Sequence, residues 1–147
     1  MDQDKHQLLR DINRSIIKLR GVYSAWSKKH GISYNEMLVL YTIRDSGFCT
    51  QKQICDSYLL PRQTMNHVIS DMRRRGLLTI SEEHCGGREK AFVLTEEGKS
   101  YARPLLDSLT EIELEAIGRI GRENLCVVAE AVLSFGTAIQ TAIEENA

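Results

Sequence analysis

The sequence predicts a mostly α-helical protein with one small β-hairpin. Apolar residues recur three or four residues apart over most of the 147 positions, which is the helical period. The period changes between Leu77 and Leu94, where two short apolar segments flank the pair Gly86 and Gly87. Polar capping residues stand where several of the helical stretches begin. Each expected element follows from one of these three signals.

The first expected helix occupies residues 5–30 and ends near Gly31. Its apolar side chains form one amphipathic stripe. They are Leu9, Ile12, Ile16, Leu19, Tyr23 and Trp26. Ser33 and Glu36 then have the spacing of a capping box, so a second helix should begin near Tyr34 and stop before Gly47.

Two short helices are expected next, separated by a turn. Thr50 and Gln53 form a second capping box, and Pro61 suits the first position of the following helix. The inward stripe of that helix is Thr64, Met65, Val68, Ile69 and Met72. Its outward residues are Arg62, Gln63, Asn66, His67, Ser70 and Arg73. This is the order of a helix-turn-helix, in which the second helix enters the major groove of DNA.

The outward side chains of the second helix have the chemistry of base recognition. Arg binds guanine in a bidentate manner, Asn and Gln bind adenine, and Ser or Thr donates to a phosphate or a base. The expected DNA contacts in the two helices are Thr50, Gln51, Arg62, Gln63, Thr64, Asn66, His67 and Arg73. The alternative is a solvated helix surface, since most polar helix surfaces only face water.

The segment after the second helix predicts a wing. Arg73–Gly76 ends the helix with cations in its last turn and a glycine just beyond. Residues 77–81 and 91–94 are then the two strands of a hairpin whose tip is too polar for a core. Arg88 near the tip is expected to enter a minor groove. Residues 33–98 therefore form a predicted winged helix-turn-helix core.

Three stretches together resemble the MarR family of bacterial transcriptional regulators. They are PRQTMNHVISDMRRRGLL, the Gly-Gly turn with Arg88, and FVLTEEGKSY. The resemblance covers nearly the whole chain, and its most specific parts are RRRGLL and LTEEG. It implies the family fold, a homodimer, a minor-groove role for Arg88 and a small aromatic or phenolic effector. The wing departs from the family pattern, because Glu89 follows Arg88 where a second basic residue is common.

The C-terminal part predicts further helices. Thr95 can cap a helix with Glu96 and Glu97 in its first turn, and Gly118 and Gly121 should break it. An apolar stripe then runs to the end of the sequence: Leu125, Val128, Val132, Phe135, Ile139 and Ile143. The helices at 5–30 and 99–145 either cover their own domain or pair with a second copy. Pairing is favoured, and the two recognition helices would then reach major grooves about 34 Å apart on a pseudo-palindromic operator.

Composition bounds the remaining possibilities. One domain of 1–147 is expected, no apolar run approaches membrane-spanning length, and the charged N-terminus lacks a secretory signal, which favours a cytoplasmic protein without a membrane partner. The net charge of −1 divides into +3 over residues 1–43, +2 over 44–90 and −6 over 91–147. The acids are thus concentrated away from the expected DNA contacts.

Other functional classes find less support in the sequence. The four histidines are scattered, and no nucleophile elbow, HExxH or glycine-rich phosphate loop is present, so no enzyme and no cofactor are expected. The sequence contains no CxxC pair, which would be the usual sign of a metal site. Cys49, Cys55 and Cys126 lie among apolar neighbours and are expected in the core, whereas Cys85 is expected to be exposed. The oxidation-sensing branch of the family carries its cysteine in the first long helix, where this chain has none.

Two interpretations stay open at this point. A winged helix can also bind a protein partner without DNA, although the polar outward residues of the second helix favour DNA. A small aromatic effector would need an apolar cleft with few polar groups. Candidate lining residues are Tyr23, Trp26, His30 and Tyr41, with Met37 beside them. Plain core packing is the alternative for the same side chains.

Overall fold

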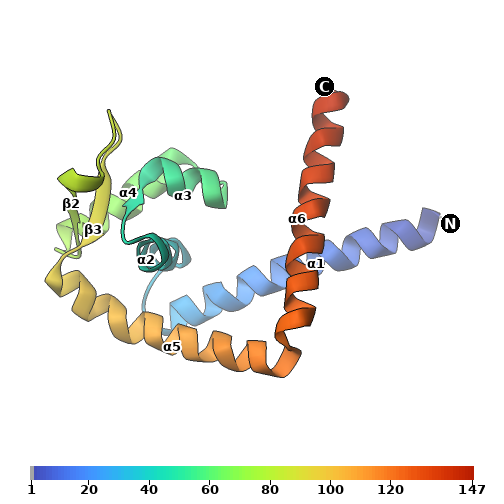
Figure 1. The fold of residues 1–147 in the computed structure, drawn as a ribbon, viewed down its shortest axis with the longest axis horizontal. Coiled ribbons are helices and arrows are strands. Elements are labelled where there is room, and N and C mark those ends of the chain that lie inside the picture. Colours follow the sequence, from blue (N-terminus) through green and yellow to red (C-terminus); the bar gives the residue numbers. More distant parts are fainter. Residues whose placement is uncertain (1) are drawn as a thin grey trace. The chain divides into compact units, whose positions relative to one another are not determined.

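The computed structural model describes residues 2–147 and has the expected mostly α-helical fold with a small antiparallel sheet (Figure 1). The elements in chain order are α1 (Asp2–Lys29), α2 (Tyr34–Ser46), β1 (Cys49–Thr50), α3 (Gln51–Tyr58), α4 (Arg62–Arg74), β2 (Leu78–Ile80), η1 (Glu82–His84), β3 (Ala91–Leu94), α5 (Glu96–Ile120) and α6 (Arg122–Glu145). They form two compact units that meet within α5, one up to Leu106 and one from Asp107.

The sheet has the strand order β1-β3-β2, with both pairings antiparallel. The expected hairpin is β2 with β3, in a register that places Thr79 opposite Val93. Strand β1 was not expected. It has only two residues, and its pairing of Cys49 with Phe92 cannot be read from local sequence. Because β1 runs directly into α3, it fixes the start of the helix-turn-helix against the sheet.

The hydrophobic core of the first unit lies among α2, α3, α4, the sheet and the start of α5. Val39, Leu40 and Ile54 are fully buried there, as are Met65 and Met72 from the inward stripe of α4. Ile69 is also buried, and Thr64 and Val68 are half-buried. The predicted inward stripe of α4 is therefore confirmed, and its burial orients the opposite face of the helix toward solvent.

The expected helix caps are mostly confirmed. Thr50 forms the complete capping box with Gln53, and Oγ of Ser33 accepts a 3.0 Å hydrogen bond from the N–H of Glu36. The carboxylate of Glu36 turns instead to the far end of α4. Pro61 is the N-cap of α4 and not its first helical residue, because its ψ of 139° is extended. The turn before it contains Leu59 in the left-handed region with φ of 51°.

Thr95 joins the end of α4 to the start of α5. Its hydroxyl donates a 2.6 Å hydrogen bond to the carbonyl of Gly76 and accepts a 2.9 Å bond from the N–H of Gly98. Its N–H donates to the carbonyl of Leu77 at 3.1 Å. Gly76 has φ of 76°, which an L side chain rarely adopts. The stretches RRRGLL and LTEEG are thus the two sides of one hydrogen-bonded junction.

The second unit contains the rest of α5 together with α6. Gly118 lies within α5, so the expected break there is wrong, and the chain turns at Gly121 with φ of 91°. No residue of α6 is buried. By length and composition alone α6 is apolar enough to cross a membrane, which corrects the expectation that no segment approaches this property. The prediction considered only unbroken runs of apolar residues. In α6 the apolar residues are interrupted by neutral Ser, Thr and Gln side chains, which carry no charge and keep the mean hydropathy high.

We expect Gly98→Ala to destabilise the protein. A Cβ atom at position 98 would overlap the carbonyl oxygen of Leu77 and lie 2.9 Å from its carbonyl carbon, and a backbone atom cannot move aside as a side chain can. Overpacking of this kind costs about 1–3 kcal/mol in the free energy of unfolding, measured by urea denaturation.

Gly21→Ala in α1 is the matched control, because an added Cβ there meets no atom within 4 Å. This variant should lose no stability and can gain up to about 1 kcal/mol. Equal stability of Gly98→Ala and the parent would contradict the close approach of α5 to Leu77.

Candidate DNA interface

The outward residues of α4 are exposed as expected. Arg62, Gln63, Asn66, His67 and Arg73 all lie on the solvent side of the helix. Only Thr64 among the predicted contacts of this helix is half-buried, because it belongs to the inward stripe. No acid interrupts the first turn of α4, so nothing on the helix itself opposes an approaching phosphate there.

The start of α3 lies beside the start of α4. Gln51 donates from Nε2 to the backbone carbonyl of Arg62 at 2.8 Å. Thr50 precedes Gln51 as the N-cap, and its Oγ1 accepts from the N–H of Gln53 at 3.0 Å. Thr50, Gln51 and Arg62 are therefore brought together at one end of the helix-turn-helix. Arg73 lies three turns further along α4, with its guanidinium 5.7 Å from the ring centroid of Phe92.

The wing presents Arg88 at a tight turn. Gly86 and Glu89 exchange two backbone hydrogen bonds, and Gly87 between them has φ of 58°. Arg88 is exposed, as the sequence predicted. Between β2 and the turn of the wing lies η1, where the His84 ring stacks on Phe48 with centroids 4.4 Å apart. This stacking anchors the hairpin to the segment between α2 and β1.

Sequence reasoning missed the partners of Glu89. Its Oε1 accepts a 2.9 Å hydrogen bond from the backbone N–H of Lys52, and its Oε2 lies 3.7 Å from Nη2 of Arg62. The wing, the first turn of α3 and the first residue of α4 therefore meet at one carboxylate. The only signal in the sequence was the acid after Arg88, which gives no information about its partners 37 and 27 residues away.

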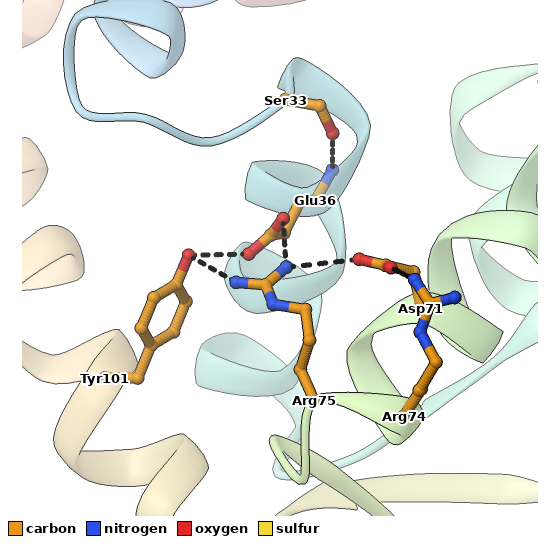
Figure 2. Close-up of polar contacts among 6 residues, drawn as sticks. All are labelled: Ser33, Glu36, Asp71, Arg74, Arg75 and Tyr101. Carbon is orange, nitrogen blue, oxygen red and sulfur yellow. Dashed lines mark hydrogen bonds and ion pairs between the residues drawn. The ribbon is translucent and has the colours of Figure 1, made fainter.

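Arg75 links the C-terminal end of α4 to two other helices, and Figure 2 shows its guanidinium between two carboxylates. Its Nη1 donates to Glu36 at 2.9 Å and to Asp71 at 3.3 Å, while Nη2 donates to the hydroxyl of Tyr101 at 3.0 Å. Tyr101 donates in turn to Glu36 at 2.8 Å. We call these four residues the Arg75 cluster. It ties α4 to α2 and to the first half of α5.

The electrostatics of the Arg75 cluster follow from its partners. Hydrogen bonding to Glu36 raises the pKa of Arg75, so its charge is permanent. The neighbouring Arg74 lowers the pKa of Asp71, mainly through a hydrogen bond. Partial burial raises the pKa of Tyr101, so its hydroxyl keeps its proton and remains a donor. The cluster is therefore held by opposite charges across the physiological pH range.

The predicted effector residues are not among the lining of the open depression described below. Trp26 and His30 stack with centroids 4.2 Å apart, and Tyr41 lies under the guanidinium of Arg44 at 4.0 Å. Tyr23, Trp26 and Tyr41 are half-buried and His30 is exposed. An open depression of about 320 Å³ lies between α1 and the start of α2. Its lining is Ile17, Arg20, Gly21, Ser24 and Tyr34.

The cysteines divide into two buried and two exposed thiols. Cys49 and Cys55 are in the core as expected, and Cys85 is exposed as expected. Cys126 is exposed, which corrects its assignment to the core, because α6 buries none of its residues within this chain. Burial raises the pKa of Cys49 to about 12 and also raises that of Cys55. Within residues 2–147 no three His, Cys, Asp or Glu side chains are grouped as metal ligands.

Charge is divided between the two units of the chain. Residues 1–106 carry 17 Lys and Arg against 12 acids, a net charge of +5. Residues 107–147 carry 2 against 8, a net charge of −6. The expected DNA contacts all belong to the positive unit. A nearly neutral total thus conceals a basic half, which is what binding to a polyanion requires.

Comparisons with known proteins agree with this geometry. The model of the MarR family matches residues 30–89, which span α2, the helix-turn-helix and most of the wing. A MarR family regulator from Neisseria meningitidis, NMB1585, has 28% sequence identity and a TM-score of 0.85, covering 95% of this chain and 99% of that one. Among curated proteins no sequence matches significantly.

Two more distant structures share the fold. A MarR family transcriptional regulator from Listeria monocytogenes, solved in complex with a 26mer DNA, has 17% identity and a TM-score of 0.68, covering 89% of this chain and 87% of that one. BpsR from Bordetella bronchiseptica, whose DNA binding is regulated by 6-hydroxynicotinic acid, has 16% identity and a TM-score of 0.67, covering 88% and 98%.

We expect loss of the Tyr101 hydroxyl to weaken the Arg75 cluster. Tyr101→Phe removes one bond to Glu36 and one from Arg75, and should lower the free energy of unfolding by about 1 kcal/mol. Arg75→Ala should cost more, about 1–3 kcal/mol, because it leaves the carboxylate of Glu36, only 9% exposed, without its cation. Urea denaturation measures both.

Tyr34→Phe is the control for Tyr101→Phe. Tyr34 is half-buried like Tyr101, and no hydrogen bond to its hydroxyl is found among the described residues. A loss as large as that of Tyr101→Phe would mean that the Arg75 cluster adds nothing specific.

Thiol labelling should separate the cysteines by burial. In the native protein iodoacetamide should modify Cys85 and leave Cys49 unmodified, even at about pH 9, because the pKa of Cys49 is about 12 and the thiol is buried. In urea both should react. Peptide mass spectrometry after each treatment gives the result, and native labelling of Cys49 at the rate of Cys85 would contradict the assigned core position.

Proposed function

We propose that the chain is a transcriptional regulator of the MarR family that binds a pseudo-palindromic DNA operator as a homodimer and acts as a repressor. The observation that carries the proposal is the exposed outward face of α4 together with Arg88. Arg62, Gln63 and Asn66 offer the donors and acceptors that read base edges in a major groove. Arg88 at the wing turn suits the narrower minor groove.

Exposed apolar surface supports the homodimer. The large apolar residues of α6 that remain exposed are Val127, Val128, Val132, Leu133, Ile139 and Ile143. Leu8, Ile17 and Leu19 on α1 are exposed as well. Apolar surface of this extent in one chain normally marks an interface. Twofold pairing through the terminal helices would bury it and would present two copies of α4 to one duplex.

A small aromatic effector is the finer part of the proposal. BpsR supports it, since 6-hydroxynicotinic acid regulates DNA binding by that protein. In this chain Tyr23, Trp26, His30 and Tyr41 remain the proposed contacts, and the open depression beside Arg20 and Tyr34 offers a cation and an aromatic ring. An effector would act only by binding one spacing of the two α4 helices better than another.

The test is selection of bound duplexes from a random-sequence DNA pool by the purified protein, with its mass in solution measured by sedimentation. The proposal expects a dimer and enrichment of an inverted repeat. A folded dimer that enriches no sequence would favour the alternative of a winged helix that binds a protein partner. A monomer that binds a single half-site would contradict the pairing.

Substitutions should separate base recognition from backbone binding. Arg62→Ala should lose about 1–3 kcal/mol of discrimination at one position of each half-site, because a bidentate base contact is removed. Arg88→Ala should weaken binding to many sequences and reduce the slope of affinity against salt by about one ion per protomer. Titration of the selected duplex and of a scrambled one at two salt concentrations measures both effects.

Lys28→Ala is the control, because it removes the same charge from an exposed position in α1 outside the proposed contacts. It should change neither discrimination nor the salt slope. If all three variants bound like the parent, the assigned contacts would be wrong.

A further inference from the structure

The carboxylate of Glu89 is a fixed group and not a mobile surface acid. Its backbone is held in the wing turn by two hydrogen bonds with Gly86, and its Oε1 accepts from the N–H of Lys52 at 2.9 Å. The side chain is only 31% exposed. The N–H of Lys52 is one of the donors that a helix leaves unpaired in its first turn, so Glu89 satisfies α3 as an additional cap.

Arg62 is the more exposed partner in this contact. Its side chain is 65% exposed, and its Nη2 lies 3.7 Å from Oε2 of Glu89. The other donors of the guanidinium remain available on the solvent side. Gln51 meanwhile holds the backbone carbonyl of Arg62 at 2.8 Å. An ion pair this exposed adds little to stability, but it places the guanidinium of Arg62 beside a carboxylate that the wing holds in position.

Resting on the proposed function, we propose that Glu89 is a positioning residue that orients Arg62 for base recognition. An arginine that is already held near its bound conformation loses less rotamer freedom when it meets a base. The carboxylate takes one edge of the guanidinium and leaves the other for a bidentate contact with a guanine. The acid that departs from the usual wing pattern would thus contribute specificity through Arg62.

Glu89→Gln is a clean test because it removes the charge and keeps the shape. The amide oxygen of glutamine can still accept from Lys52, so the anchoring of the wing is kept while the ion pair with Arg62 is lost. Glu83→Gln is the matched control. It removes the same charge from the same hairpin, and no ion pair of Glu83 is found within residues 2–147.

The measurement is the affinity of each variant for the selected operator and for operators changed at single base pairs. We expect Glu89→Gln to bind the operator about three- to tenfold more weakly and to lose discrimination at the same base pair as Arg62→Ala and at no other. Glu83→Gln should keep the discrimination of the parent. In an Arg62→Ala background, Glu89→Gln should have no further effect on discrimination, since the proposed route runs through Arg62.

If Glu89 instead repelled DNA, the change in affinity of Glu89→Gln would have the opposite sign. If the acid merely competed with DNA phosphates, Glu89→Gln would bind all duplexes more tightly and keep its discrimination, and this result would overturn the proposal. Discrimination lost evenly at every position, or lost equally in Glu83→Gln, would also overturn it. If the parent protein enriches an operator but the variants do not behave as expected, the role of Glu89 is wrong and the proposed function stands. A parent that selects none removes the proposed function and this inference together.

Discussion

The geometry of the core depends on the two hydrogen bonds of the Thr95 hydroxyl. The hydroxyl binds the carbonyl of Gly76 after α4 and the N–H of Gly98 at the start of α5, while the carbonyl of Leu77 packs against the bare Cα of Gly98. One side chain therefore binds both the segment that follows α4 and the first turn of α5. The two strands of the wing leave from the same junction, so the wing and α4 share one fixed origin.

The two ends of α4 are held by different chemistry. At its C-terminal end, Arg75 is bound by Glu36 and Tyr101, which places the helix relative to α2 and α5. At its N-terminal end, Gln51 and Glu89 meet Arg62 in a more exposed setting. The C-terminal end is thus partly buried and strongly paired, whereas the end proposed to face DNA is more exposed. The helix is therefore placed by contacts at its C-terminal end, while Arg62 in its first turn keeps a largely exposed side chain.

Local signals in the sequence predicted most of the fold. Thr50 and Thr95 begin helices because their side chains satisfy backbone N–H groups within three residues, and the stripe of α4 follows from the helical period. The turn of Glu36 toward Arg75 and the pairing of β1 with β3 were not predictable, since each joins residues about 40 apart whose meeting depends on the finished core. The exposure of Cys126 escaped prediction for a related reason. An apolar stripe specifies that a helix is covered, and it does not specify by which chain.

The bare surface of α6 has a consequence for gene dosage. A helix that buries none of its residues within its own chain gains cover only by association, and under the proposed pairing that association is second order in protein concentration. Operator occupancy would then rise with the square of the number of chains when the protein is scarce. A modest change in synthesis or degradation would move the promoter further than it could with a monomeric regulator. The least protected helix of the chain would therefore set how steeply the cell responds to the amount of this protein.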